Sequence, residues 1–164
     1  MDKELILKEA KKILKIDINH IHGLSHWERV EKFGHYLAGL NGADKKLLSL
    51  FAFTHDLGRV NDTYEDFLHG ERSAEIAKKF FQEGIIKATD EQMDKLIYAC
   101  QHHNKPKAQS DDLTIRTCWD SDRLDIWRVG IEPNPLYLYT NEAKNPKVIQ
   151  MAKGLSIGEI KFLG

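Results

Sequence analysis

The chain has 164 residues, of which 41% are apolar and 30% are charged, and its formal net charge is −1. The length fits about one domain, and the composition predicts a soluble, globular protein rather than a disordered one. A net charge near zero gives no general basic field, so we predict that neither a nucleic-acid polymer nor a membrane is a partner.

Two further features predict a cytoplasmic location. The N-terminal stretch MDKELILKEAKKILK is charged throughout, which does not fit a signal peptide. Cys100 and Cys118 lie far apart and outside any CxxC pattern, as expected for reduced, buried thiols. The longest apolar run is far shorter than the roughly 18 residues that a membrane span needs.

The first three predicted helices lead to the most apolar part of the chain. Residues 3 to 15 carry an apolar stripe at helical spacing. Ser25 to Glu28 has the form of a capping box, and the helix that it opens should end at Asn41-Gly42. Asp44 then caps KKLLSLFAFTHD, which is apolar on nearly every side and is therefore expected to be the central helix of the fold.

Four more helices are predicted downstream. They cover about His69 to Gln82, Asp90 to about Asn104, 113 to 129 before Gly130, and 146 to 153. No segment alternates at period two, and the long irregular pieces are 57 to 68 and 130 to 145. The sequence thus predicts an all-α, single-domain bundle of about six or seven helices.

The adjacent residues His55 and Asp56 follow the apolar run of the central helix. Neighbouring helical side chains point about 100° apart, so both can reach one point beyond the end of the helix. Imidazole nitrogen and carboxylate oxygen are suitable ligands for a divalent ion. Alternatively, His55 is a core histidine held by its neighbour's carboxylate, with Arg59 close by.

Other titratable residues stand at the ends or in the middle of apolar-striped helices. His26 begins the second helix and Asp122 lies within the sixth, while His69 opens the fourth and His102 and His103 close the fifth. Burying such groups is costly unless they are paired or liganded. One shared site would satisfy all five helices.

The ordered set H-x-x-R-V, HD and D-x-D-x-L-D resembles the HD superfamily of metal-dependent phosphohydrolases, over about residues 20 to 130. The resemblance implies an HD-type helical domain over residues 1 to 164, with 131 to 164 forming a C-terminal loop and short helix. It implies one or two divalent ions (Mn, Fe, Co, Ni, Zn or Mg) per chain. The implied metal ligands are His26, His55, Asp56 and Asp122, and the residues for a second metal or for catalysis are His69 and one or both of His102 and His103.

Three aspartates compete for the last ligand position. Asp122 fits the family spacing, Asp125 lies one turn further and can orient a ligand, and Asp120 is expected to point elsewhere. Two other histidines have plainer interpretations: His35 as surface or core packing, and His22 as a solvated loop residue or a supporting residue of the site.

Several arginines flank the implied ligands. A guanidinium group suits phosphate oxygens, so Arg72 is expected to act in catalysis, and Arg59 and Arg128 to face the substrate. Salt bridges to nearby carboxylates are the alternative for each. The three tryptophans fall at positions typical of helix packing.

The resemblance implies a phosphohydrolase that cleaves a small phosphorylated substrate or a nucleotide by attack of metal-activated water. The candidate general acid is His69 or a histidine of the pair His102 and His103, of which His103 is the first choice. Two alternatives stay open: a di-iron HD-fold oxygenase and a non-catalytic helical interaction module. The loop 130 to 145 is expected to close over the site. The sequence leaves the substrate, the metal and the oligomeric state undetermined.

Overall fold

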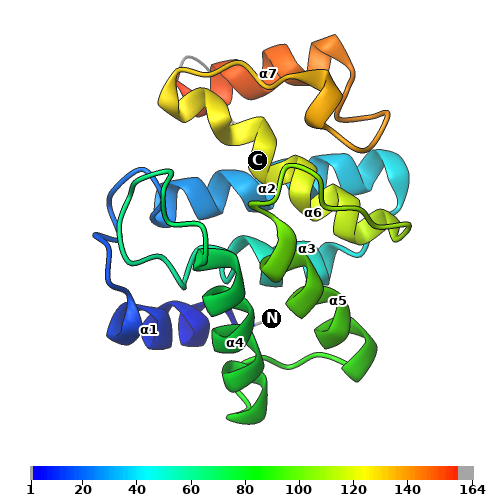
Figure 1. Cartoon of the computed structure of the whole chain (residues 1–164). Coiled ribbons are helices and arrows are strands. Elements are labelled where there is room, and N and C mark those ends of the chain that lie inside the picture. Colours follow the sequence, from blue (N-terminus) through cyan, green and yellow to red (C-terminus); the bar gives the residue numbers. More distant parts are fainter. Residues whose placement is uncertain (1, 159–164) are drawn as a thin grey trace.

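The computed structural model describes residues 2–158, and between them the chain forms seven α-helices, two short 3-10 helices and no strand (Figure 1). The predicted all-helical architecture is therefore confirmed. The α-helices are α1 Lys3–Ile13, α2 Leu24–Asn41, α3 Lys45–Ala52, α4 His69–Gln82, α5 Asp90–His102, α6 Leu113–Leu124 and α7 Pro146–Ser156. The 3-10 helices are η1 Asp125–Val129 and η2 Pro135–Tyr137. The end of the expected C-terminal segment, 159 to 164, lies outside the described residues.

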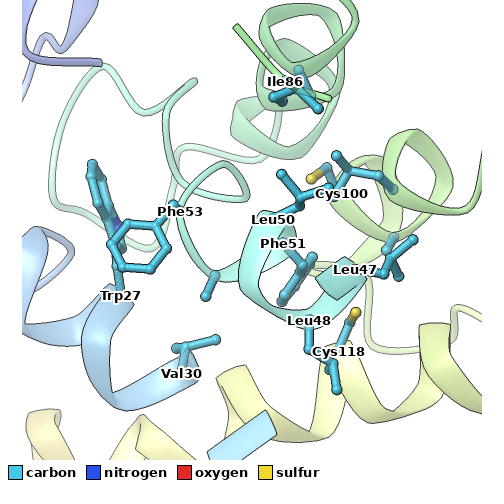
Figure 2. Packing of buried hydrophobic residues seen from close by; sticks show 14 of the residues in the cluster. Trp27, Val30, Leu47, Leu48, Leu50, Phe51, Phe53, Ile86, Cys100 and Cys118 are labelled. Atoms are coloured by element: carbon cyan, nitrogen blue, oxygen red, sulfur yellow. The ribbon is translucent and has the colours of Figure 1, made fainter. Parts of the chain in front are cut away.

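Helix α3 is the buried centre of the fold, as predicted. It lies between α2 and α6 on one side and α5 on the other (Figure 1). Leu47, Leu48, Leu50 and Phe51 project from it in different directions, and each is at most 1% exposed (Figure 2). Because every side of this helix is covered, the residues that follow it are held in fixed positions.

The ends of two helices differ from the prediction. Helix α3 stops at Ala52 rather than at Asp56, and residues 53–58 form tight turns. The Thr54 hydroxyl donates to Leu50 O at 2.7 Å, which competes with continued backbone bonding. Helix α6 likewise ends at Leu124 and tightens into η1, which Gly130 closes at φ +77°.

The predicted capping box at Ser25 is wrong. The N-cap of helix α2 is Gly23, two residues before Ser25, and the helix begins at Leu24. Leu24 N donates to Ile18 O at 2.7 Å, and a Cβ on Gly23 would lie 1.9 Å from that same oxygen, so the tight turn requires glycine. A capping box does occur at the start of α5, between Thr89 and Gln92.

Two of the three tryptophans and both cysteines are buried in the core. Trp27 and Trp119 are fully buried, and Trp127 donates from Nε1 to Ile149 O at 3.2 Å. Cys100 and Cys118 are buried free thiols.

Helix α7, predicted up to 153, runs to Ser156 and packs on α2 and η1. Within residues 2–158, no helix has both the length and the apolar character required to cross a bilayer.

Candidate metal centre

Six titratable side chains from distant parts of the chain meet in the interior. They come from α2, the turns after α3, α4, the end of α5, and α6: His26, His55, Asp56, His69, His103 and Asp122. The first five are at most 4% exposed, and the Asp122 side chain, at 18%, is the most open of the six. We call these six residues the His–Asp cluster.

One half of the cluster joins His26, His55 and Asp122. His26 Nε2 lies 3.2 Å from His55 Nε2 and 3.2 Å from Asp122 Oδ1. Asp56 Oδ2 completes this half, 3.7 Å from His26 Nε2 and 3.5 Å from His55 Nε2. Ligand atoms that share one ion at about 2.1 Å lie roughly 3 to 3.5 Å from one another, so these spacings fit a metal site.

The other half joins His69 and His103 to the second oxygen of Asp56. The two Nε2 atoms are 2.9 Å apart, and Asp56 Oδ1 lies 3.4 Å from His69 Nε2 and 3.6 Å from His103 Nε2. Asp56 therefore presents one oxygen to each half. A carboxylate in this position can bridge two ions.

The ring orientations leave the Nε2 atoms free to bind a cation. The Nδ1 atom of His55 faces Phe51 O and Ala52 O at 3.1 Å each, and that of His103 faces Cys100 O at 2.7 Å. Nδ1 of His69 faces Asp66 O. A carbonyl only accepts, so each Nδ1 carries the proton and each Nε2 of a neutral ring carries a lone pair. Lone pairs that face one another at 2.9 Å repel unless a cation lies between them, and the cluster therefore fits a divalent ion.

The electrostatics agree with this assignment of protons. Burial lowers the pKa of His55 to about 3 and that of His69 to about 4, so both rings are neutral at pH 7. Burial opposes the charge of Asp56 and Asp122, yet the surrounding histidines keep the pKa of each carboxyl below its ordinary value. Neutral imidazoles and charged carboxylates are the forms that bind metal.

A layer of polar residues around the cluster holds its ligands in place. Asp125 Oδ2 lies 2.6 Å from His26 Nδ1, and Arg29 binds the same carboxylate with Nε at 2.7 Å and Nη2 at 3.0 Å. This agrees with the expected orienting position of Asp125. Arg29 is the arginine of the H-x-x-R-V motif; no role was predicted for it, although it lies three residues after His26 and thus on the same side of α2. Ser156 from α7 also donates to Asp125, at 2.7 Å.

Asp120 points away from the cluster, as expected. It accepts hydrogen bonds from Tyr139 N and Thr140 N, both at 2.8 Å, and from the Thr140 hydroxyl at 2.7 Å. Asp120 thereby anchors the loop of residues 130 to 145 to α6.

The structure places His103 in the cluster and His102 outside it. The ring of His102 packs on Tyr98 with 4.4 Å between centroids. His35 forms a hydrogen bond with Ser49 Oγ at 2.8 Å, which fits its predicted role in packing.

His22 is not solvated. It is 8% exposed, its Nδ1 is 2.9 Å from Asp62 Oδ1, and its ring centroid is 6.3 Å from that of His26. Asp62, which no sequence pattern indicates, therefore supports a residue beside the cluster.

The arginines predicted to act in catalysis or to face the substrate make contacts within the protein. Arg59 Nε donates to Asp56 Oδ1 at 2.9 Å, beside the cluster. Arg72 bonds Gly58 O and Asp66, and Arg128 bonds Ile21 O at 2.9 Å and Asp125 O at 3.0 Å. Their contact with a substrate stays a prediction.

Helices α4 and α5 approach closely beside the two histidines that they carry. A Cβ added to Gly70 would lie 2.8 Å from Cys100 O and 3.1 Å from Gln101 O, and neither backbone atom can move aside easily. We expect Gly70→Ala to push α4 from α5 and to lower the free energy of unfolding by about 1–3 kcal/mol, measured by chemical denaturation.

The matched control is Gly39→Ala in α2, where an added Cβ meets nothing within 4 Å. Relief of the glycine entropy cost should stabilise this variant by about 0.5–1 kcal/mol. Equal stabilities of Gly70→Ala and the parent would contradict the close contact between α4 and α5.

The all-helical fold and the buried His–Asp cluster define the class of protein. The model of the HD domain matches residues 23–142, so the chain belongs to the HD domain family. Among solved structures, it is similar to that of a predicted HD superfamily hydrolase from an uncultured Thermotogales bacterium. The TM-score is 0.68 at 22% identity, over 96% of this chain and 88% of that chain, which shows a shared fold. No curated protein matches the sequence.

Proposed function

We propose that this protein is a metal-dependent phosphohydrolase that cleaves a phosphate ester or a nucleotide by attack of metal-activated water at the His–Asp cluster. The observation that carries the proposal is the convergence of four Nε2 atoms on the two oxygens of Asp56 and on Asp122. Membership of the HD domain family supports a phosphorylated substrate.

The chain offers ligands for one or two ions. His26, His55, Asp122 and one oxygen of Asp56 would hold the first, and His69, His103 and the other oxygen of Asp56 would hold the second. When bound, a divalent ion supplies water of lowered pKa and withdraws charge from a phosphoryl oxygen.

The protein's own residues set the geometry of this chemistry. Asp125 fixes the ring of His26, and Arg59 fixes one oxygen of Asp56, so the ligands need no reorganisation when the substrate binds. If only the first set of ligands is in use, Nε2 of His69 or His103 faces the cluster with its lone pair, so it would take up a proton released by the attacking water and then deliver that proton to the leaving alkoxide. If both sets are in use, the proton comes from another group.

Metal content tests the proposal directly. Protein purified without chelator should contain one or two divalent transition ions per chain by elemental analysis, and His55→Ala should lose most of this metal because it removes a buried ligand. His35→Ala, which removes a histidine outside the cluster, should keep the parent's content. Chelation should lower the melting temperature of the parent, because the ion binds only the folded chain.

Equal metal in the parent and in His55→Ala would contradict the proposed ligands. No metal, with stability unchanged by chelation, would instead support the non-catalytic module. If metal is present, a panel of phosphate esters and nucleotides then tests hydrolysis, with release of inorganic phosphate as the readout.

A second candidate function is a di-iron oxygenase. The observation in its favour is Asp56, whose two oxygens face separate pairs of histidines, as a bridging carboxylate would. Two irons per chain after anaerobic purification, with dioxygen uptake and no phosphate release from any ester, would favour this function over hydrolysis.

A further inference from the structure

A pocket of about 250 Å³ opens beside the His–Asp cluster. Its walls come from the end of α5 and the residues after it, from the segment where α6 meets η1, and from the loop of residues 130 to 145. His103 belongs both to the pocket lining and to the cluster, where its Nε2 lies 3.6 Å from Asp56 Oδ1. The pocket is therefore next to the proposed reacting centre.

The chain segment that carries Asp122, the most exposed member of the cluster, also forms part of the pocket wall. Arg123 follows Asp122 directly, Ile126 lies about one turn further along the chain, and both line the pocket. A substrate whose phosphoryl group reaches the cluster past Asp122 would thus place its organic group against these walls.

The walls are mainly apolar. Ile126, Pro133, Tyr137 and Leu138 form much of the lining, together with Pro106. A dry cavity of about 150 Å³ is sufficient to bind benzene, so this pocket has room for an aryl ring or a short alkyl chain. Burial of such a group releases ordered water from both surfaces.

The charges of the pocket do not suit a nucleotide. Arg123 already donates to Tyr137 O and Lys105 O, and its guanidinium lies 4.8 Å from the ring centroid of Tyr139. Glu132 adds a carboxylate to the lining, which would repel further phosphate groups. Arg59, Arg72 and Arg128 are likewise engaged by protein acceptors.

We infer that the substrate is a phosphomonoester whose organic group is small, uncharged and apolar, an aryl or alkyl group rather than a nucleoside. The inference rests on the proposed function, since it assumes that the phosphoryl group binds at the His–Asp cluster. The apolar pocket then holds the group that leaves as the alcohol.

Binding of two phosphonates that cannot be hydrolysed tests this inference without relying on turnover. Phenylphosphonate should bind the metal-loaded protein at least about tenfold more tightly than methylphosphonate by calorimetry, because only the former fills the pocket. Tyr137→Ala removes a pocket wall and should reduce this preference to about threefold or less. The control is Leu136→Ala, a neighbouring side chain that is 87% exposed and outside this pocket, and it should keep the parent's preference.

Hydrolysis gives a second readout with matched leaving groups. Benzyl phosphate and adenosine 5′-monophosphate both release a primary alkoxide, so a higher kcat/KM for benzyl phosphate would reflect the pocket. A higher value for the nucleotide would overturn the inference, as would equal affinities for the two phosphonates or an unchanged preference in Tyr137→Ala. A clear phenyl preference without hydrolysis of any ester would refute the proposed function and uphold the pocket. Hydrolysis of an ester without a preference for phenylphosphonate would uphold the proposed function and refute the inference about the pocket.

Discussion

Asp56→Asn should lose most of its bound metal and hydrolyse phosphate esters at least about 100-fold more slowly than the parent. Residues that merely orient a ligand cost about 10–100-fold when they are replaced, and Asp56 is placed to contact both proposed ions directly. The amide keeps the shape of the side chain but removes the negative charge that both halves of the cluster share. Elemental analysis and phosphate release measure the two effects.

The control is Asp120→Asn, which alters a buried carboxylate on α6 that lies outside the cluster and binds the backbone at Tyr139 and Thr140. Its metal content should equal that of the parent. Metal loss in Asp120→Asn with retention in Asp56→Asn would reverse the proposed assignment of ligands.

Asp125→Ala should lower the free energy of unfolding by about 3 kcal/mol, measured by denaturant titration. The substitution removes the acceptor of His26 and leaves Arg29, which is only 20% exposed, without its bidentate partner. Loss of one member of a buried ion pair costs about 3–5 kcal/mol, and the partial exposure of Arg29 places this case at the lower end. Metal affinity should also fall about 10–100-fold, since the ring of His26 is no longer held.

Ser156→Ala provides the comparison for Asp125→Ala. It removes a single neutral donor to the same carboxylate, so a loss of about 1 kcal/mol and an unchanged metal affinity are expected. Similar losses in both variants would mean that Arg29 and His26 do not depend on Asp125.

The fold could be predicted from the sequence because the patterns that indicate its helices are local in the chain. Apolar stripes and capping residues such as Asp44 mark the helices, and the uniformly apolar run before His55 marks the buried one. The end of α3 was not accessible, since the apolar run continues through Phe53 while the side-chain bond of Thr54 and the turns that follow depend on three-dimensional context.

The residues of the candidate site likewise include some that the sequence indicates and some that it does not. His26, His55, Asp56 and Asp122 were chosen by their resemblance to the family pattern, and the structure brings them together. The sequence could have distinguished His103 from His102. The buried stripe of Met93, Leu96 and Cys100 continues at helical spacing to His103, which places this residue on the buried face of the helix. The role of Asp62 could not be predicted from the sequence, since its partner His22 lies 40 residues away and neither residue belongs to a periodic pattern.

The orienting contact between His26 and Asp125 spans 99 positions of the chain. During synthesis at about 5–20 residues per second, the N-terminal imidazoles therefore exist for several seconds before their acidic partners emerge from the ribosome. A nascent polypeptide shorter than about 125 residues lacks both Asp122 and Asp125, so the set of ligands proposed for the first ion is complete and oriented only after translation has passed these positions.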